Sequence, residues 1–99
     1  MLSGLAGRVV ESCAARSLRL VAAESCTAGL VASALAEVPG ASKVLWGSFV
    51  CYTPEAKIAM LGLDGSLIRA GGAVSAEVAE AMADGARSRS GADIAVAVT

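Results

Sequence analysis

Hydrophobic residues recur along this chain with two different spacings, one helical and one strand-like. Apolar side chains three and four positions apart predict amphipathic helices, whereas short continuous or alternating apolar runs predict strands. We expect helices at about residues 3–16, 27–38 and 75–90. We expect strands at residues 18–24, 44–52 and 93–99. The strands are apolar enough to belong to a sheet that is covered by helices on both faces.

Turn-forming residues separate these elements and predict one further helix. Thr53 can cap a helix N-terminus and Pro54 suits the first helical position, so a short helix is expected from there to Gly62. Residues 63–74 contain three glycines and are expected to form a loop. Gly47 falls inside the second strand, where it indicates a β-bulge.

The predicted order of elements is α-β-α-β-α-α-β. Helices that alternate with apolar strands predict a layered α/β/α fold with a largely buried sheet, and a length of 99 residues supports one domain over residues 1–99. In such sheets the loops after the carboxyl ends of the strands carry ligands. Because the chain stops at Thr99, where such a loop would begin, we expect a domain that is incomplete at its C-terminus.

Composition argues against several classes of function. The net charge is −1 and the arginines are dispersed, so no basic surface for nucleic acid is expected. The chain has no histidine, and its three cysteines lack metal-binding spacing, so we expect no metal site and a reducing, cytoplasmic location. Glu24 interrupts the apolar stretch of residues 20–35, which argues against a membrane span. Only 17% of residues are charged, which favours a homo-oligomer.

The segment from Ala23 to Gly29, with the sequence AESCTAG, concentrates reactive side chains where a strand is expected to pass into a helix. Backbone N–H groups at a helix N-terminus lack partners within the helix and can bind an anion or a developing oxyanion. A nucleophile at this turn, such as Ser25 or Cys26, would therefore have part of a hydrolase site beside it.

The absence of histidine restricts the choice of general base. A Ser-His-Asp triad is excluded, so a nucleophilic Ser25 would need a lysine, tyrosine or carboxylate as its base. Lys57 is expected in the first turn of a helix beside apolar residues, and both features favour the neutral amine that a general base requires. Tyr52 could pass the proton or hold the lysine.

Each of these residues also has a purely structural interpretation. Ser25 or Thr27 can simply cap a helix. Cys26 can be a buried small hydrophobic residue rather than a nucleophile. Lys57 can be a surface charge and Tyr52 a half-buried strand residue. Glu24, a carboxylate at the end of an apolar strand, needs a partner and can hold the turn by accepting backbone N–H bonds.

The same residues carry a family resemblance. The AESCTAG segment resembles the hallmark of the CinA C-terminal domain family, which contains the nicotinamide-nucleotide amidases. The resemblance continues in order along nearly the whole chain. The further matching segments are residues 38–42, 52–57, 61–62, 72–75, 82–86 and 91–99.

This resemblance implies hydrolysis of the carboxamide of nicotinamide mononucleotide to nicotinate mononucleotide and ammonia, without a cofactor. It implies that Ser25 attacks the amide carbon and that Lys57, with Tyr52, takes the serine proton. Backbone N–H groups near Cys26 to Gly29 would stabilise the oxyanion. The residues expected to bind the pyridine nucleotide are Glu24, Cys26, Thr27, Gly29 and Thr99.

The chain departs from the family pattern at Ala28 and at its end, and the departure at the end is the one that bears on function. Ala28 stands where the hallmark has its first glycine, a common family variant with no expected cost. The family's Gly-Ile-Ala-Gly-Pro loop, and a later arginine thought to help hold the nucleotide, would follow the position of Thr99. An alternative hypothesis is therefore a catalytically inactive, truncated domain that serves as a nucleotide-binding or assembly module.

Overall fold

Three parallel strands form the sheet at the centre of the computed structural model, which describes residues 2–99. The strands are β1 (Leu20–Glu24), β2 (Leu45–Val50) and β3 (Ile94–Val98), in the spatial order β2-β1-β3. The central strand β1 is buried along its whole length, as its uninterrupted apolar sequence predicts. Because the strands are parallel, their carboxyl ends meet at one edge of the sheet, with Glu24 opposite both Val50 and Val98.

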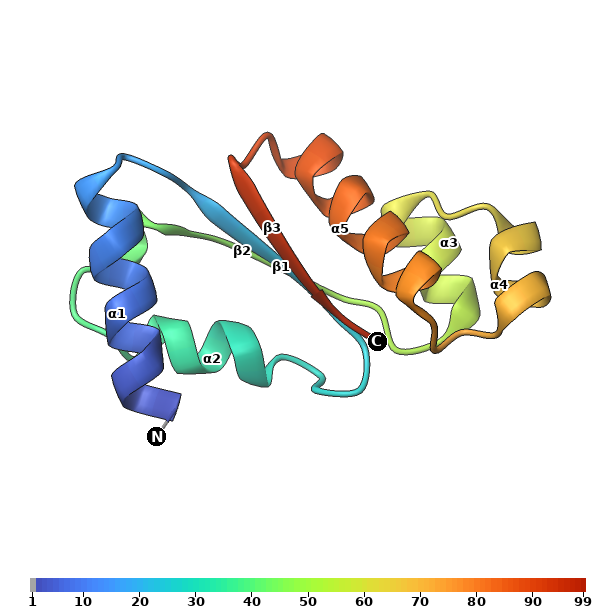
Figure 1. The fold of residues 1–99 in the computed structure, drawn as a ribbon, viewed down its shortest axis with the longest axis horizontal. Coiled ribbons are helices and arrows are strands. Elements are labelled where there is room, and N and C mark those ends of the chain that lie inside the picture. Colours follow the sequence, from blue (N-terminus) through green and yellow to red (C-terminus); the bar gives the residue numbers. More distant parts are fainter. Residues whose placement is uncertain (1) are drawn as a thin grey trace.

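Helices cover both faces of the sheet, so the predicted α/β/α layering is confirmed (Figure 1). One face carries α1 (Leu2–Ala15) and α2 (Leu30–Ala36), and the other carries α3 (Pro54–Leu61), α4 (Gly65–Gly71) and α5 (Ala76–Ser90). A short 3-10 turn, η1 (Ala41–Lys43), leads into β2.

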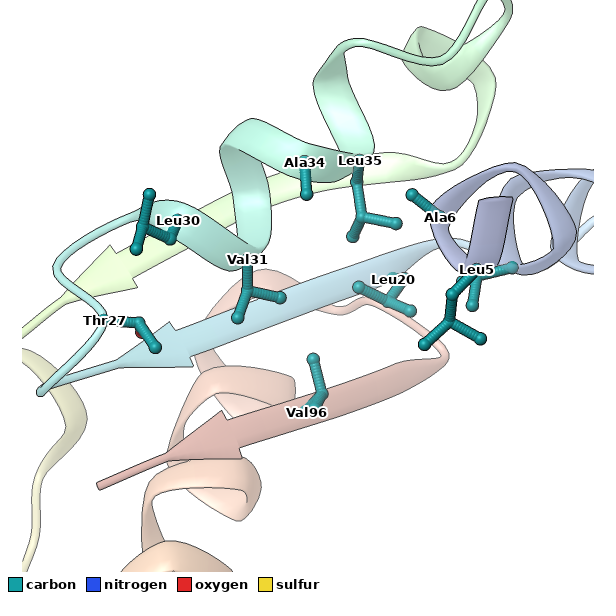
Figure 2. A pocket seen from close by; sticks show the side chains of 10 residues that line it. Leu5, Ala6, Leu20, Thr27, Leu30, Val31, Ala34, Leu35 and Val96 are labelled. Atoms are coloured by element: carbon teal, nitrogen blue, oxygen red, sulfur yellow. The ribbon is translucent and has the colours of Figure 1, made fainter. Parts of the chain in front are cut away.

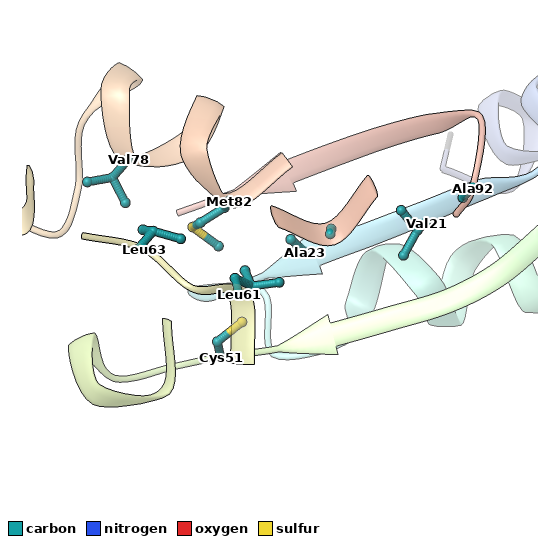
Figure 3. Packing of buried hydrophobic residues seen from close by; sticks show 9 residues of the cluster. Val21, Ala23, Cys51, Leu61, Leu63, Val78, Met82 and Ala92 are labelled. Atoms are coloured by element: carbon teal, nitrogen blue, oxygen red, sulfur yellow. The ribbon is translucent and has the colours of Figure 1, made fainter. Parts of the chain in front are cut away.

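The main hydrophobic core lies between the sheet and α5 (Figure 3). Val78, Met82 and Ala86 lie on one face of α5 at helical spacing and are fully buried. They meet Val21 and Ala23 of β1 in one cluster. This packing fixes the central strand and therefore the position of the turn that follows it.

The opposite face of the sheet carries an open apolar groove of about 440 Å³ (Figure 2). Helices α1 and α2 form its walls, and side chains of β1 and β3, including Leu20 and Val96, line it. Val96 remains 37% exposed and Leu30, at the start of α2, is 67% exposed. Side chains on this face are thus less completely covered than those that face α5.

Two expectations from the sequence were wrong. Residues 63–74 do not form one loop, because Asp64 caps a two-turn helix by accepting the Ser66 N–H and α4 follows. The second helix begins at Leu30 rather than at Thr27, because the intervening residues form a turn. The caps expected at Thr53 and Ser75 are present, and each hydroxyl accepts a backbone N–H three residues ahead.

The bulge indicated by Gly47 is also present. Leu20 of β1 pairs with Leu45 of β2, but the next residue, Val21, pairs with Gly47, so Trp46 is the extra residue. Over residues 2–99, no helix combines the length and the apolar character that crossing a membrane requires.

Candidate active site

Glu24, the last residue of β1, organises the turn that leads into α2. Its side chain is completely buried, and both carboxylate oxygens accept hydrogen bonds. The donors are Thr27 Oγ1 at 2.8 Å, the N–H groups of Gly29 (3.1 Å), Val31 (2.9 Å) and Ala32 (3.0 Å), and Ser48 Oγ at 2.9 Å. The carboxylate therefore occupies the N-terminus of α2, where the helix dipole favours negative charge.

The ionisation of Glu24 reflects two opposing effects. Burial alone raises the pKa of the carboxyl group, but the hydrogen bonds from Val31, Thr27, Ala32 and Ser48 lower it, and the pKa lies below its ordinary value of 4.5. Glu24 is therefore held as a charged residue inside the fold. The sequence offered two roles for Glu24, a contact with substrate and a hold on the turn through backbone N–H bonds, and the structure shows the bonds of the second role.

Ser25 follows Glu24 and lies beside Lys57, as the predicted nucleophile–base pair requires. The Lys57 Nζ atom lies 2.9 Å from Ser25 Oγ. The main-chain carbonyl oxygen of Tyr52 lies 3.2 Å from Ser25 Oγ and 3.4 Å from Lys57 Nζ. Ser25 is 6% exposed and Lys57 is 2% exposed, whereas Tyr52 is 67% exposed.

These three residues come together because of the topology. Ser25 follows the central strand β1, Tyr52 follows the neighbouring strand β2, and the two carboxyl ends are adjacent. Lys57 lies one turn into α3, which the Thr53 cap and Pro54 start immediately after β2. The position of the cap thus sets which side chain of α3 faces Ser25.

Lys57 is buried without a carboxylate beside it in the described part of the chain. Among residues 2–99, the hydrogen-bonding partners of Nζ are the Ser25 hydroxyl and the Tyr52 carbonyl, and neither is a carboxylate. In its neutral form an amine at this position can accept the serine proton. Burial also raises the pKa of the neighbouring Cys51 thiol.

Two backbone amides directly after Ser25 are available to an oxyanion. The N–H groups of Gly29, Val31 and Ala32 are used by Glu24, so the expectation that the amides up to Gly29 bind an oxyanion needs correction. Within the described part of the chain, the N–H groups of Cys26 and Thr27 have no acceptor. Amides immediately after a nucleophile are common oxyanion donors.

Cys26 and Thr99 lie beside each other at the same edge of the sheet. The exposed Cys26 thiol donates to the Thr99 carbonyl oxygen at 3.7 Å, and the Thr99 hydroxyl donates to the Ala73 carbonyl oxygen at 2.7 Å. Thr99 thus joins the end of β3 to the segment before α5. Its hydroxyl is engaged within the fold.

The structure brings the Ser25 hydroxyl and the Lys57 amine together as the sequence predicted, with Cys26 and Thr99 nearby. Tyr52 contacts the pair through its main-chain carbonyl oxygen, whereas the prediction concerned its side chain. The Thr27 hydroxyl and the Gly29 N–H both donate hydrogen bonds to the Glu24 carboxylate. The sequence reasoning missed Ser48, whose hydroxyl donates to Glu24 from β2. A serine in the middle of an otherwise apolar strand was the available signal. Neither metal-ligand clusters nor helices long enough for a membrane occur among residues 2–99.

The fold and the site together define an α/β protein with a buried Ser–Lys pair at the carboxyl edge of a parallel sheet. Comparison with known proteins specifies the family. The family model of the CinA C-terminal domain matches residues 2–99, and the chain belongs to this family.

Known relatives carry names from the same family. The chain is 52% identical over 96 residues to a CinA-like protein of Mycolicibacterium paratuberculosis, which corresponds to 94% of this chain and 22% of that protein. A CinA-like protein of Mycobacterium tuberculosis is 54% identical over 81 residues, or 82% of this chain and 19% of that protein. The chain therefore spans about a fifth of the length of these curated relatives.

Solved structures show the same arrangement. The competence/damage inducible protein CihA from Agrobacterium tumefaciens superposes with a TM-score of 0.96 at 45% identity, over 99% of this chain and 59% of that one. A CinA superfamily protein from Escherichia coli superposes with a TM-score of 0.98 at 36% identity, over 100% of this chain and 58% of that one.

Proposed function

We propose that this chain carries the catalytic site of an amidohydrolase that converts nicotinamide mononucleotide to nicotinate mononucleotide and ammonia. The observation that carries the proposal is the 2.9 Å approach of the Lys57 amine to the Ser25 hydroxyl, with both residues buried at the end of the sheet. The substrate is inferred from the family resemblance of the AESCTAG segment and of the segment from Tyr52 to Lys57.

The reaction would proceed through an acyl-enzyme. Neutral Lys57 takes the proton of the Ser25 hydroxyl while Oγ forms a bond to the carboxamide carbon. The resulting ammonium group then gives a proton to the amide nitrogen, the carbon–nitrogen bond breaks, and ammonia leaves. Water attacks the ester carbon while Lys57 takes one of its protons. The carbon–Oγ bond then breaks, Lys57 returns that proton to Ser25 Oγ, and the acid product loses its remaining proton to solvent and leaves as the carboxylate.

The amides of Cys26 and Thr27 would stabilise the tetrahedral intermediate. They follow the nucleophile directly and are free of internal acceptors within the described residues. Glu24 would act indirectly, by holding the turn and the start of α2 so that these amides and Ser25 keep their positions. Hydrogen-bond donors that are fixed before the reaction need no reorganisation as charge develops.

Tyr52 and Thr99 would border the substrate. Tyr52 is largely exposed beside the Ser–Lys pair, so its ring is available to contact a planar pyridine or to assist proton transfer. Thr99 lies across from Cys26 at the end of β3. Both residues belong to segments that match the family resemblance.

Product analysis tests this proposal. The chain is incubated with nicotinamide mononucleotide, and ammonia and nicotinate mononucleotide are each quantified over time. Equal molar release of the two products supports the amidase. Loss of the nucleotide with nicotinamide as the product would instead indicate cleavage of the glycosidic bond and would overturn the proposed reaction.

The open groove between α1 and α2 favours a second candidate function, assembly into a homo-oligomer. Its lining is apolar, and Leu5 and Leu30 at its rim are 56% and 67% exposed (Figure 2). Sedimentation equilibrium of the chain and of a Leu30→Glu variant tests this role. Association of the native chain that the charge abolishes supports it, whereas a monomer over the whole concentration range would exclude it.

A further inference from the structure

We infer that the main-chain carbonyl oxygen of Tyr52 is the third member of the Ser–Lys site. It holds the Ser25 hydroxyl and the Lys57 amine in place, and it accepts an N–H of the ammonium group that forms when Lys57 takes the serine proton. This inference rests on the proposed function for its reaction. The geometry that supports it does not depend on which substrate is bound.

The three polar atoms form a closed triangle. Lys57 Nζ is 2.9 Å from Ser25 Oγ, Ser25 Oγ is 3.2 Å from the Tyr52 oxygen, and that oxygen is 3.4 Å from Lys57 Nζ. The serine hydroxyl donates to the carbonyl in this arrangement. Rotation about its Cβ–Oγ bond turns the proton toward Lys57 and starts the reaction.

The carbonyl has the role that an aspartate has in a Ser-His-Asp triad. That aspartate orients the base and stabilises the cation that the base becomes. Within residues 2–99, Lys57 Nζ has two hydrogen-bond partners, the Ser25 hydroxyl and this carbonyl oxygen. Once Ser25 Oγ is bonded to the substrate carbon, the Tyr52 carbonyl remains as the acceptor for the newly charged amine. Hydrogen bonds from charged donors are stronger than neutral ones.

Neighbouring contacts keep the peptide group of Tyr52 in a fixed orientation. On one side, the Cys51 N–H donates to the Glu24 carbonyl oxygen at 2.9 Å, which ties the end of β2 to β1. On the other side, Thr53 caps α3 and precedes Pro54, a combination that restricts the backbone of Thr53. The strand end and the helix start therefore aim this carbonyl at the site.

A single-atom change in the backbone tests the inference. Total synthesis of the 99-residue chain, with ligation at Cys51, allows the Tyr52–Thr53 amide to be replaced by an ester. An ester carbonyl is a weaker acceptor than an amide carbonyl. The Thr53 N–H that is lost has no acceptor within the described residues, so no other hydrogen bond disappears.

The matched control is the same replacement at the Val74–Ser75 bond. Ser75 is also a hydroxyl-bearing cap that begins a helix, and its own N–H likewise has no acceptor in the part of the chain that the structure describes. Thermal unfolding of both ester chains checks that the fold is retained. Pro54→Ala, which relaxes the restriction on Thr53, is a second variant with an ordinary backbone.

The first readout is labelling of Ser25 by an alkyl phosphonofluoridate, followed by intact mass. Ser25 Oγ bonds to phosphorus, fluoride leaves with its electron pair, and the hydroxyl proton goes to Lys57. We expect the Thr53 ester to label about tenfold more slowly than the all-amide chain and the Ser75 ester to label at the all-amide rate. Equal rates for the all-amide chain, the Thr53 ester and Pro54→Ala would overturn the inference, as would an unreactive Ser25 in the all-amide chain.

The second readout separates this inference from the proposed function. With nicotinamide mononucleotide as substrate, the Thr53 ester should lower kcat and leave KM unchanged, because the carbonyl acts on the base and not on the substrate. If labelling is slowed but no chain releases ammonia, the role of the carbonyl stands and the amidase proposal falls. A rise in KM at constant kcat, with unchanged labelling, would assign the carbonyl to substrate binding and overturn the inference.

Discussion

The Nζ atom of Lys57 lies 2.9 Å from the Oγ atom of Ser25, although the two residues are 32 positions apart in the chain. One comes from the turn after β1 and the other from the first turn of α3. Their meeting depends on two sequence features, the strand-to-helix turn at Ser25 and the Thr53–Pro54 helix start. The chemistry is thus assembled by adjacent strand ends of a parallel sheet.

Replacing the lysine should remove the base and spare the fold. Lys57→Met keeps an unbranched side chain, shorter by one atom, and removes a buried polar group. The thermal midpoint of the variant should therefore equal or exceed that of the native chain. We expect kcat for nicotinamide mononucleotide to fall about 10²–10⁴-fold, the usual contribution of a general base. Ammonia release and circular dichroism measure the two effects, and undiminished turnover would exclude Lys57 as the base.

Glu24→Gln should destabilise the protein in a pH-dependent way. The folded pKa of Glu24 lies below its ordinary value of 4.5, so the charged carboxylate stabilises the fold above that value. This contribution is lost as the pH falls through the folded pKa. At pH 7 we expect the variant to lose about 1.5–3 kcal/mol of unfolding free energy, the scale of hydrogen bonds to a charged group.

Urea unfolding at pH 7 and in the acid range measures this difference. The difference in unfolding free energy between the native chain and Glu24→Gln should decrease as the pH falls below 4.5. A gap that is constant over the whole range would contradict the assignment of a low pKa to Glu24. Ser48→Ala, which removes one of the donors to the carboxylate, should show a smaller effect of the same sign.

A glycine in α5 allows two helices to approach closely. A Cβ atom at Gly85 would overlap the carbonyl oxygen of Leu61, which belongs to α3. Gly85→Ala should therefore cost about 1–3 kcal/mol of unfolding free energy, as overpacked sites do. Gly7→Ala in α1 is the control, because a Cβ there meets nothing within 4 Å, and it should stabilise by about 0.5–1 kcal/mol. Urea denaturation measures the unfolding free energy of both variants and of the native chain. An unchanged unfolding free energy in Gly85→Ala would contradict the close contact.

The three thiols should react at clearly different rates. Cys26 is exposed, whereas Cys13 and Cys51 are buried. Burial also raises the pKa of Cys51, which leaves less of the reactive thiolate. With a disulfide reagent we expect one fast thiol in the native protein and three in denaturant. Two fast-reacting thiols under native conditions would contradict this prediction, because they would show that Cys13 or Cys51 is accessible to the reagent in the folded protein.

The sequence identified most of the elements because their signals are local. The apolar runs, the caps at Thr53 and Ser75, and the terminating glycines at 62 and 91 each act within a few residues. The helix α4 was missed because glycines at residues 65, 71 and 72 suggested a loop, whereas two of them lie at the ends of the helix and the third follows it.

The candidate site was predictable in its residues but not in its hydrogen bonds. Ser25, Tyr52 and Lys57 could be proposed from the turn, the missing histidine and the family resemblance. The sequence suggested that Glu24 could hold the turn by accepting backbone N–H bonds. The identity of all its donors could not be predicted, because they span residues 27–48 and include Ser48 on another strand. The position of the Tyr52 carbonyl oxygen beside Ser25 and Lys57 could not be predicted, because every residue has a backbone carbonyl and the sequence does not indicate which one points into the site.

The central claim is that Ser25 is the nucleophile of an amidase, and the most direct test is ammonia release from nicotinamide mononucleotide by the native chain and by Ser25→Ala. Thermal unfolding of both proteins accompanies the assay, so that a lost rate is not confused with a lost fold. We predict release by the native chain and a decrease of at least about 10³-fold in a folded Ser25→Ala. A folded variant that releases ammonia at the native rate, or a native chain that releases none, would contradict the claim.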